Sequence, residues 1–218
     1  MKICLMKKIA STLLIISSIA FLVSGCRKDV LDNLTDDEAR VYITKYDSAV
    51  NFSTYQTFRL ADSVSVIRDG QLVRHDLTSY DAALLAAISE QMVARGYRLE
   101  TDEGKAPDLG LQVSRITTEY TGVVSYDDYW GGYGSYWDPF YWGYGGYGYS
   151  FPYAFGTYTF REGALSIDML DLQNPDTSSN KLKSVWTGLG RGTGIFNTSN
   201  VNEIVQTLFS QSPYIKRS

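Results

Sequence analysis

The sequence contains very little cysteine and histidine. Its 218 residues include two cysteines, Cys4 and Cys26, and one histidine, His75. If the segment that carries Cys4 is removed, the remaining chain has one cysteine and can form no internal disulfide. A structural zinc site needs about four Cys or His ligands, so we expect no metal and no other non-covalent cofactor.

Basic residues are also scarce. The chain has 20 Lys and Arg against 24 Asp and Glu. The first 25 residues hold Lys2, Lys7 and Lys8 and no acid, so their removal leaves 17 basic and 24 acidic side chains, a formal charge of −7. Nucleic-acid binding depends on clustered Lys and Arg, and we therefore expect no nucleic-acid partner.

No apolar run is long enough to cross a bilayer as an ordinary helix. The longest candidate, residues 9–23, has 15 residues, whereas a membrane span needs about 20. It follows a basic start and ends in Leu22-Val23-Ser24-Gly25-Cys26. This order of basic, apolar and small residues before a cysteine resembles the lipobox of bacterial lipoproteins.

The lipobox resemblance implies cleavage before Cys26 and attachment of diacylglycerol to its sulfur. Two or three acyl chains, at about 0.8 kcal/mol per buried methylene, would hold the protein at a membrane. We expect a lipid-anchored protein of the cell envelope, on the periplasmic side of the outer membrane, with exposure at the cell surface left open. The alternatives are an uncleaved helical anchor and an ordinary signal peptide with an incidental cysteine.

The rest of the chain divides into a tether, one domain and a tail. We predict a signal peptide over residues 1–25, a polar, acidic and flexible tether over 26–40, a domain over 41–213 and a tail over 214–218. Acidic residues after a lipidated cysteine resemble a surface-export signal in some lineages, but Arg27-Lys28-Asp29 matches it poorly, and a solvated spacer is the better explanation of the segment.

Hydrophobic periodicity predicts an α+β fold. Residues 41–46, 55–60, 97–99, 158–171 and 182–189 have strand character, and Asp69-Gly70 predicts a hairpin between apolar pairs. Leu84, Leu85, Ile88 and Met92 follow helical spacing between Thr78-Ser79 and Gly96. A second helix is expected near Val201–Phe209, with Asn200 and Glu203 as a capping pair. The order predicts a mostly antiparallel sheet with two helices packed on one face.

Two of the expected strands alternate polar and apolar residues. Leu109, Leu111 and Val113 alternate with glycine, glutamine and serine, and Ile167 and Met169 flank Asp168. This pattern predicts strands with one buried and one solvated face, and it makes Asp168 a solvent-facing residue.

An irregular insert rich in Gly, Tyr and Trp interrupts the domain over residues 126–158. Sixteen of these 33 residues are aromatic and eight are glycine. Exposed aromatic rings stack on sugars, fill protein interfaces and lie at membrane surfaces. We expect contact with an envelope protein or glycan through Tyr129, Trp130, Tyr136, Trp137, Tyr141 and Trp142. The alternative is a low-complexity loop that folds over the sheet or stays mobile.

Several segments, taken in order, resemble the bacterial lipoprotein family known as domain of unknown function 4136. The resemblance covers residues 41–213 and implies an envelope lipoprotein of α+β fold with no known activity. The hairpin before the first helix is longer than in the family, and Ser212-Pro213-Tyr214 replaces its double proline. The matching segments are Tyr46-Asp47, Asn51–Phe58, Ala87-Ile88, Ala94–Tyr97, Ala106–Leu109, the aromatic insert, Gly163–Asp168 and Val185–Gly188.

No catalytic constellation emerges from the residues. His75 is expected to be an exposed strand histidine, and Gly188–Gly194 a flexible strand end rather than a phosphate loop. We therefore predict a non-catalytic binding or structural module. The alternative is an envelope glycan hydrolase that uses Asp127 and Asp128, or Asp168 and Asp171, as paired acids near the aromatic insert.

Overall fold

The computed structural model describes residues 40–69, 71–117, 123–125, 139, 141–152, 157–159 and 163–217. Cys26, Tyr129, Trp130, Tyr136 and Trp137, together with Asp127 and Asp128, lie outside these residues.

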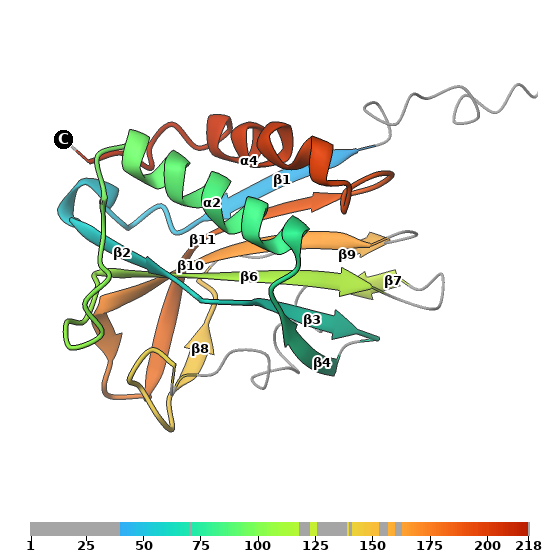
Figure 1. Ribbon diagram of the computed structural model, residues 1–218. Helices are drawn as coiled ribbons and strands as arrows, with labels where there is room; N and C mark the ends of the chain where they lie inside the picture. Colours follow the sequence, from blue (N-terminus) through green and yellow to red (C-terminus); the bar gives the residue numbers. More distant parts are fainter. Residues whose placement is uncertain are drawn as a thin grey trace, which may run out of the picture. The chain divides into compact units, whose positions relative to one another are not determined.

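The described residues form one mixed sheet with helices on one of its faces (Figure 1). The main sheet has nine strands and a central order β1-β11-β10-β6-β2-β5, and β7 and β9 form a separate pair. The strands are β1 (Val41–Tyr46), β2 (Thr57–Leu60), β3 (Val64–Arg68), β4 (Gln71–Asp76), β5 (Arg98–Leu99), β6 (Leu109–Thr117), β7 (Val123–Ser125), β8 (Gly148–Ser150), β9 (Thr157–Thr159), β10 (Ala164–Asp176) and β11 (Lys181–Arg191). The helices are α2 (Ser79–Ala94), α4 (Val201–Ser210) and the short η2 (Phe52–Thr54) and η3 (Thr198–Asn200). The predicted α+β class is confirmed.

The long strands form the antiparallel part of the sheet. β10 is antiparallel to both β6 and β11, and β1 completes that edge antiparallel to β11. Asp69 adopts a φ of 47° in the turn between β3 and β4, which confirms the hairpin. β2 and β3 both run parallel to β6, and they follow one another along the same edge of that strand.

The two helices begin differently. At α2, Thr78 and Asp81 form a complete capping box, and Gly96 follows the helix end with a φ of 92°. At α4 the predicted capping pair is wrong, because Asn200 makes no capping bond. The Asn200 side chain instead donates to the Gly194 carbonyl oxygen, and Glu203 accepts two hydrogen bonds from the Arg40 guanidinium.

Each face of the sheet has its own hydrophobic core. One core lies between the sheet and the two helices, and includes Leu84, Trp186 and Phe209. The other lies on the opposite face, where Trp142 and Leu172 pack against Gly110. A Cβ on Gly110 would lie 2.9 Å from Leu172 Cδ1 and 3.1 Å from the Trp142 ring, so glycine allows this close approach.

The prediction of a solvated face on β6 and β10 is wrong, because the second core covers that face. Gly110, Gln112, Ser114 and Asp168 are all buried, so both faces of these strands are covered. The segment predicted as a flexible strand end does contain the end of β11, at Arg191, but Gly188 and Gly190 lie within the buried strand and Trp186 packs on Gly188. Period-two alternation identifies two faces of a strand, but it does not show which face meets water.

The packed domain extends at both ends beyond residues 41–213. Arg40, in the segment predicted as tether, is buried, and its contact with Glu203 joins it to α4. In the predicted tail, Ile215 is fully buried and Tyr214 stacks on Tyr46 with ring centroids 3.9 Å apart.

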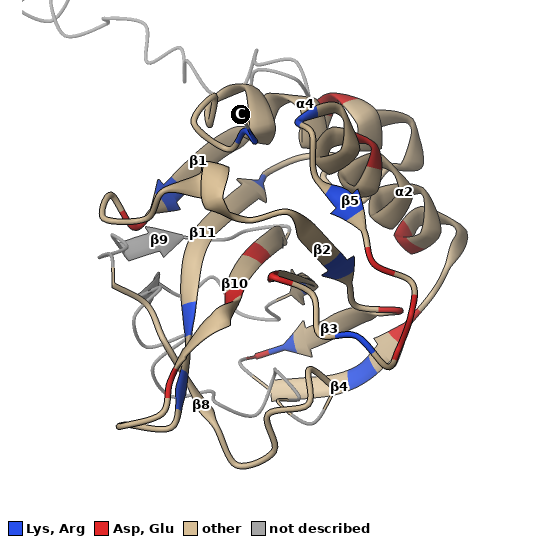
Figure 2. Cartoon of the chain, turned by 90° about the vertical axis from the view of Figure 1, so that its left-hand side faces the viewer, with Lys and Arg blue, Asp and Glu red and all other residues tan. Residues whose placement is uncertain are grey.

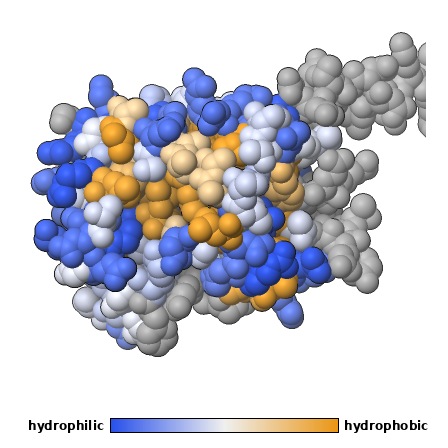
Figure 3. All heavy atoms as spheres, in the orientation of Figure 1, coloured by the Kyte–Doolittle hydropathy of each residue, from blue (hydrophilic) through white to orange (hydrophobic). Residues whose placement is uncertain are grey.

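The outward face of α2 is apolar as well as its core face. Ala82, Ala86 and Val93 are exposed along this face, and hydrophobic residues gather over α2 in Figure 3.

Among the described residues, neither helix is long and apolar enough to cross a membrane.

Candidate functional site

A gap along one edge of β6 creates a small pocket. β2 pairs with Leu109–Leu111 of β6, and β3 pairs with Ser114–Thr117 of the same strand. Residues 61–63 join β2 to β3 and pass Gln112 of β6 outside the regular strand pairing. The last regular contact is the Ala61 amide, which donates to the Leu111 carbonyl oxygen at 2.9 Å. The chain then turns away at Asp62 and Ser63, and the largely buried side chain of Gln112 lines the pocket there.

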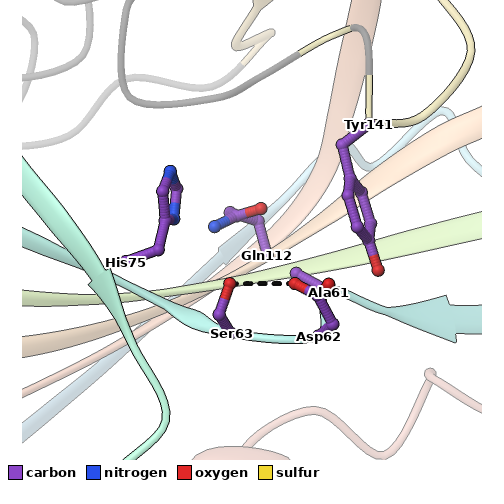
Figure 4. Close-up of a pocket in the computed structure, with 6 residues that line it drawn as sticks. All are labelled: Ala61, Asp62, Ser63, His75, Gln112 and Tyr141. Carbon is purple, nitrogen blue, oxygen red and sulfur yellow. Dashed lines mark hydrogen bonds between the residues drawn. The ribbon is translucent and has the colours of Figure 1, made fainter.

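Six of the described residues line this cavity of about 200 Å³, which we call the Tyr141 pocket. Figure 4 shows His75 and Gln112 beside one another, with Tyr141 facing them across the cavity. The turn at Ser63 lies below, where the Ser63 hydroxyl donates to Asp62 Oδ1 at 2.9 Å. These described residues are Ala61, Asp62, Ser63, His75, Gln112 and Tyr141.

Ser65, on β3, fixes the polar side of the Tyr141 pocket. Gln112 Nε2 donates to Ser65 Oγ at 2.8 Å, and Ser65 Oγ lies 3.4 Å from His75 Nδ1. With the amide nitrogen turned to Ser65, the Gln112 oxygen points toward Tyr141 (Figure 4). If Ser65 donates its proton to Nδ1, the His75 ring is in the Nε2–H tautomer.

Tyr141 is held at both its hydroxyl and its ring edge. Its hydroxyl donates to the Leu60 carbonyl oxygen at 3.2 Å, and its ring meets the Trp142 ring edge-on at a centroid distance of 4.8 Å. Burial raises the pKa of the Tyr141 hydroxyl, so the group stays protonated at neutral pH. The side chain is nevertheless 39% exposed, so part of it faces solvent.

Trp142 differs from Tyr141, its neighbour among the predicted contact residues. Its side chain is only 7% exposed because it fills the second core over Gly110. Trp142 is therefore a core residue of this domain rather than a surface ring. The described part of the aromatic insert folds over the sheet, which was one of the two alternatives that the sequence left open.

A wider hollow adjoins the Tyr141 pocket and shares Asp62 and Tyr141 with it. This second cavity of about 750 Å³, which we call the Glu103 hollow, is lined by Arg59, Leu60, Asp62, Ser89, Leu99, Glu100, Thr101, Glu103 and Tyr141. Acidic residues follow the loop after β5 in Figure 2. Three acids, Asp62, Glu100 and Glu103, line the hollow against one cation, Arg59, whose guanidinium donates to the Glu100, Asp102 and Lys105 carbonyl oxygens.

A fully buried carboxyl group lies inside the sheet. Asp168 is 0% exposed; its Oδ1 accepts from the Thr187 hydroxyl at 2.5 Å and its Oδ2 from the Ser166 hydroxyl at 2.8 Å. Burial raises the pKa of Asp168 to about 7, and these two hydrogen bonds only partly oppose that rise. Asp168 faces Gln112 across the β6–β10 ladder, which places it one strand behind the Tyr141 pocket. The prediction of a solvent-facing Asp168 is wrong.

The segments that carry the family resemblance meet in space, and their polar groups bind one another. Ser166 and Asp168 from one segment meet Thr187 from another. Asp108 Oδ2 accepts from the Gln56 and Thr57 amides at 2.7 and 3.0 Å, and the Asp108 amide donates to the Thr57 hydroxyl. These segments therefore hold the fold together.

Asp171, the other predicted acid of the pair on β10, is also engaged. Its Oδ2 accepts from the Tyr55 hydroxyl at 2.8 Å, and both of its oxygens accept from Asn174. Because Asp168 is enclosed and Asp171 is occupied, neither carboxyl group has open access to a substrate. In the described ranges, no group of three or more His, Cys, Asp or Glu side chains is arranged to hold a metal ion.

Sequence reasoning identified one wall of the Tyr141 pocket and missed the others. Tyr141 was a predicted contact residue, and the exposure of His75 on β4 was predicted correctly. Asp62, Ser63 and Gln112 carried no local signal, because the pocket arises from two successive strands that share one edge of β6. Only the β-strand pairing brings these residues together.

Comparisons with known proteins place the fold among related structures. The profile of the family described as "Domain of unknown function (DUF4136)" matches residues 43–214. The crystal structure of a DUF4136 family protein from Bacteroides thetaiotaomicron is similar, with 33% identity, a TM-score of 0.69 and coverage of 83% of this chain and 99% of that one. A PelC dodecamer from Paraburkholderia phytofirmans has 10% identity and a TM-score of 0.37, with coverage of 82% and 99%, a level from which no property is transferred. No curated protein matches the sequence.

Proposed function

The chain belongs to the DUF4136 family, and from this premise we propose that it is a lipid-anchored, non-catalytic binding module of the bacterial cell envelope. The anchor is Cys26, the last residue of the lipobox-like segment. Its acyl chains hold an acidic soluble domain beside the membrane, on the periplasmic side of the outer membrane.

One observation supports a binding role over catalysis by the predicted acid pair on β10. The carboxyl groups of Asp108, Asp168 and Asp171 are engaged in hydrogen bonds that join different strands and loops. A glycosidase needs two carboxyl groups that both reach the scissile bond. The alternative hydrolase would depend on Asp127 and Asp128, which lie outside the described residues.

The partner surface of this module includes the exposed aromatic residues of the insert. Tyr141 belongs to it, and Tyr129, Trp130, Tyr136 and Trp137 remain its predicted members. The partner is an envelope protein or a glycan. Removal of residues 126–158 is not a suitable test, because the deletion would also remove Trp142 from the second core.

The proposal predicts retention of an envelope component without turnover. The full-length lipoprotein, immobilised after gentle solubilisation, is expected to retain an envelope glycan or protein, and a retained glycan is expected to keep its chain length. Retained material is identified by mass spectrometry, and cleavage is followed as new reducing ends.

The matched control for this test is the double variant Asp127→Asn, Asp128→Asn. A binding module should retain the same material after these substitutions. New reducing ends that appear with the natural chain and disappear with the double variant would favour the hydrolase instead. Absence of any specifically retained component would refute the binding role.

A further inference from the structure

We propose that the Tyr141 pocket binds a single sugar ring of a glycan, with the next ring of the same chain in the Glu103 hollow. This inference rests on the proposed binding role and names the ligand class. It follows from the size of the two cavities, the groups that line them and their charge.

The size of the Tyr141 pocket suits one ring. Its volume of about 200 Å³ is below the roughly 300 Å³ at which pockets for drug-sized ligands begin. The wider Glu103 hollow shares two walls with it and offers about 750 Å³. A glycan with one ring in the Tyr141 pocket can therefore extend into the Glu103 hollow, past Asp62 and Tyr141.

The lining matches the two-sided chemistry of a sugar. A sugar ring presents C–H groups on its faces and hydroxyl groups around its edge. Tyr141 offers a rigid aromatic surface for the C–H face, because its hydroxyl is bound to the Leu60 carbonyl oxygen. Opposite it, Gln112 offers an amide oxygen whose direction is set by the bond from its nitrogen to Ser65.

Two further groups complete the polar edge. When His75 Nδ1 accepts a hydrogen bond from the Ser65 hydroxyl, His75 Nε2 can donate to a ligand. The Asp62 carboxylate oxygens can accept hydrogen bonds. The pocket thus combines acceptors and a donor around one aromatic ring. Hydroxyl groups, which both donate and accept, can satisfy all of these groups at once.

The charge of the two cavities disfavours an anionic ligand. Asp62, Glu100 and Glu103 line them, and Arg59 is the single cation among the described lining residues, so the carboxylates outnumber the cation three to one. A phosphate group or a nucleic acid would therefore be repelled. The chemistry favours a neutral glycan.

The single histidine makes the proposal directly testable. Because His75 is the only histidine in the chain, 13C-labelled histidine gives one imidazole signal from the wall of the pocket. The full chain, in a detergent without sugar head groups, is titrated with methyl glucoside, with N-acetylglucosamine and with the β-linked trimer of N-acetylglucosamine. At least one sugar is expected to move the His75 signal saturably, and the trimer is expected to bind about tenfold more tightly than its monomer.

Two variants test the walls of the pocket. Tyr141→Ala is expected to weaken sugar binding about tenfold through loss of the aromatic surface. Asp62→Asn is expected to weaken it severalfold, whereas Asp102→Asn, in the nearby loop but outside both linings, should not change it. Circular dichroism at the titration temperature verifies that each variant is folded.

Three results would overturn the sugar site. These are a His75 signal that no sugar moves, a shift that survives Tyr141→Ala unchanged, and an equal or larger saturable shift with inorganic phosphate. If the signal stays unmoved while the immobilised protein still retains its envelope component, the pocket assignment fails and the binding role stands. If retention also fails, the proposed function fails with it.

Discussion

Replacement of Asp168 by asparagine is expected to stabilise the protein above pH 7 and to have little effect near pH 4. In the folded state the pKa of Asp168 is raised from 3.8 to about 7, mainly by burial. Below pH 4 the Asp168 carboxyl group is protonated in both the folded and the unfolded state, so it has little effect on the free energy of unfolding. As the pH rises from 4 to 7, Asp168 ionises in the unfolded chain but stays protonated in the folded one. The free energy of unfolding therefore falls, by on the order of 4 kcal/mol in total.

The measurement is urea unfolding of the natural chain and of Asp168→Asn at pH 4.5 and pH 8. The difference between the two proteins isolates Asp168 from the other titrating groups. It is expected to favour the variant by several kcal/mol more at pH 8 than at pH 4.5, as an order of magnitude. An equal difference at both pH values would show that water reaches Asp168 and that the second face of the sheet is not closed.

Replacement of Arg115 by methionine is expected to destabilise the fold by about 3 kcal/mol. The Arg115 guanidinium lies 2.8 Å from Asp81 Oδ1 and 2.9 Å from Asp76 Oδ2, and the Asp81 side chain has no exposed surface. It thereby joins β6 to the first turn of α2 and to the end of β4. Without the arginine, the Asp81 carboxylate stays buried with only the capping bonds from Thr78.

Thermal or urea unfolding measures this loss, and Arg98→Met provides the matched control. Arg98 pairs with Glu100 at 3.4 Å, but its side chain is 66% exposed, so its removal should cost less than about 1 kcal/mol. In an Arg115→Met background, Asp81→Asn should destabilise far less than it does alone. Additive effects of the two substitutions would contradict a shared buried pair.

Most of the fold follows from local patterns in the sequence. Thr78 and Gly96 mark both ends of α2, Asp69-Gly70 marks the hairpin, and the apolar residues of α4 are buried as expected. These signals are readable because caps, turns and helical spacing depend on residues that are close in the chain. The family resemblance rests on the same kind of short segments, and the profile match supports it.

The features that the sequence did not reveal depend on contacts between distant segments. Asp168 is polar and alternates with apolar neighbours, yet the second core covers it. Trp142 lies in a segment without a regular period, and only the glycine at position 110 gives its ring a place to pack. The Tyr141 pocket exists because β2 and β3 share one edge of β6, which no local pattern encodes.

The structure also gives the family segments a physical meaning. Asp108 binds the backbone ahead of β2, and Thr187 binds Asp168 across β10 and β11. Trp186 lies over Gly188 in the helical core and donates from Nε1 to the Ser212 hydroxyl at 2.8 Å. This bond gives Ser212, which replaces a proline of the family pattern, a defined structural role. The polar residues of these segments therefore stabilise the domain.

The intact mass of the membrane-extracted protein decides whether a lipid on Cys26 holds this binding domain at a membrane. We predict a chain that begins at Cys26 and carries the added mass of two or three acyl chains on glycerol and the terminal amine. We also predict that Cys26→Ser leaves the membrane fraction or accumulates as the uncut precursor. A natural chain that starts at another residue without lipid, or a Cys26→Ser variant that is processed to the normal size and remains in the membrane fraction, would rule out a lipid anchor on this cysteine.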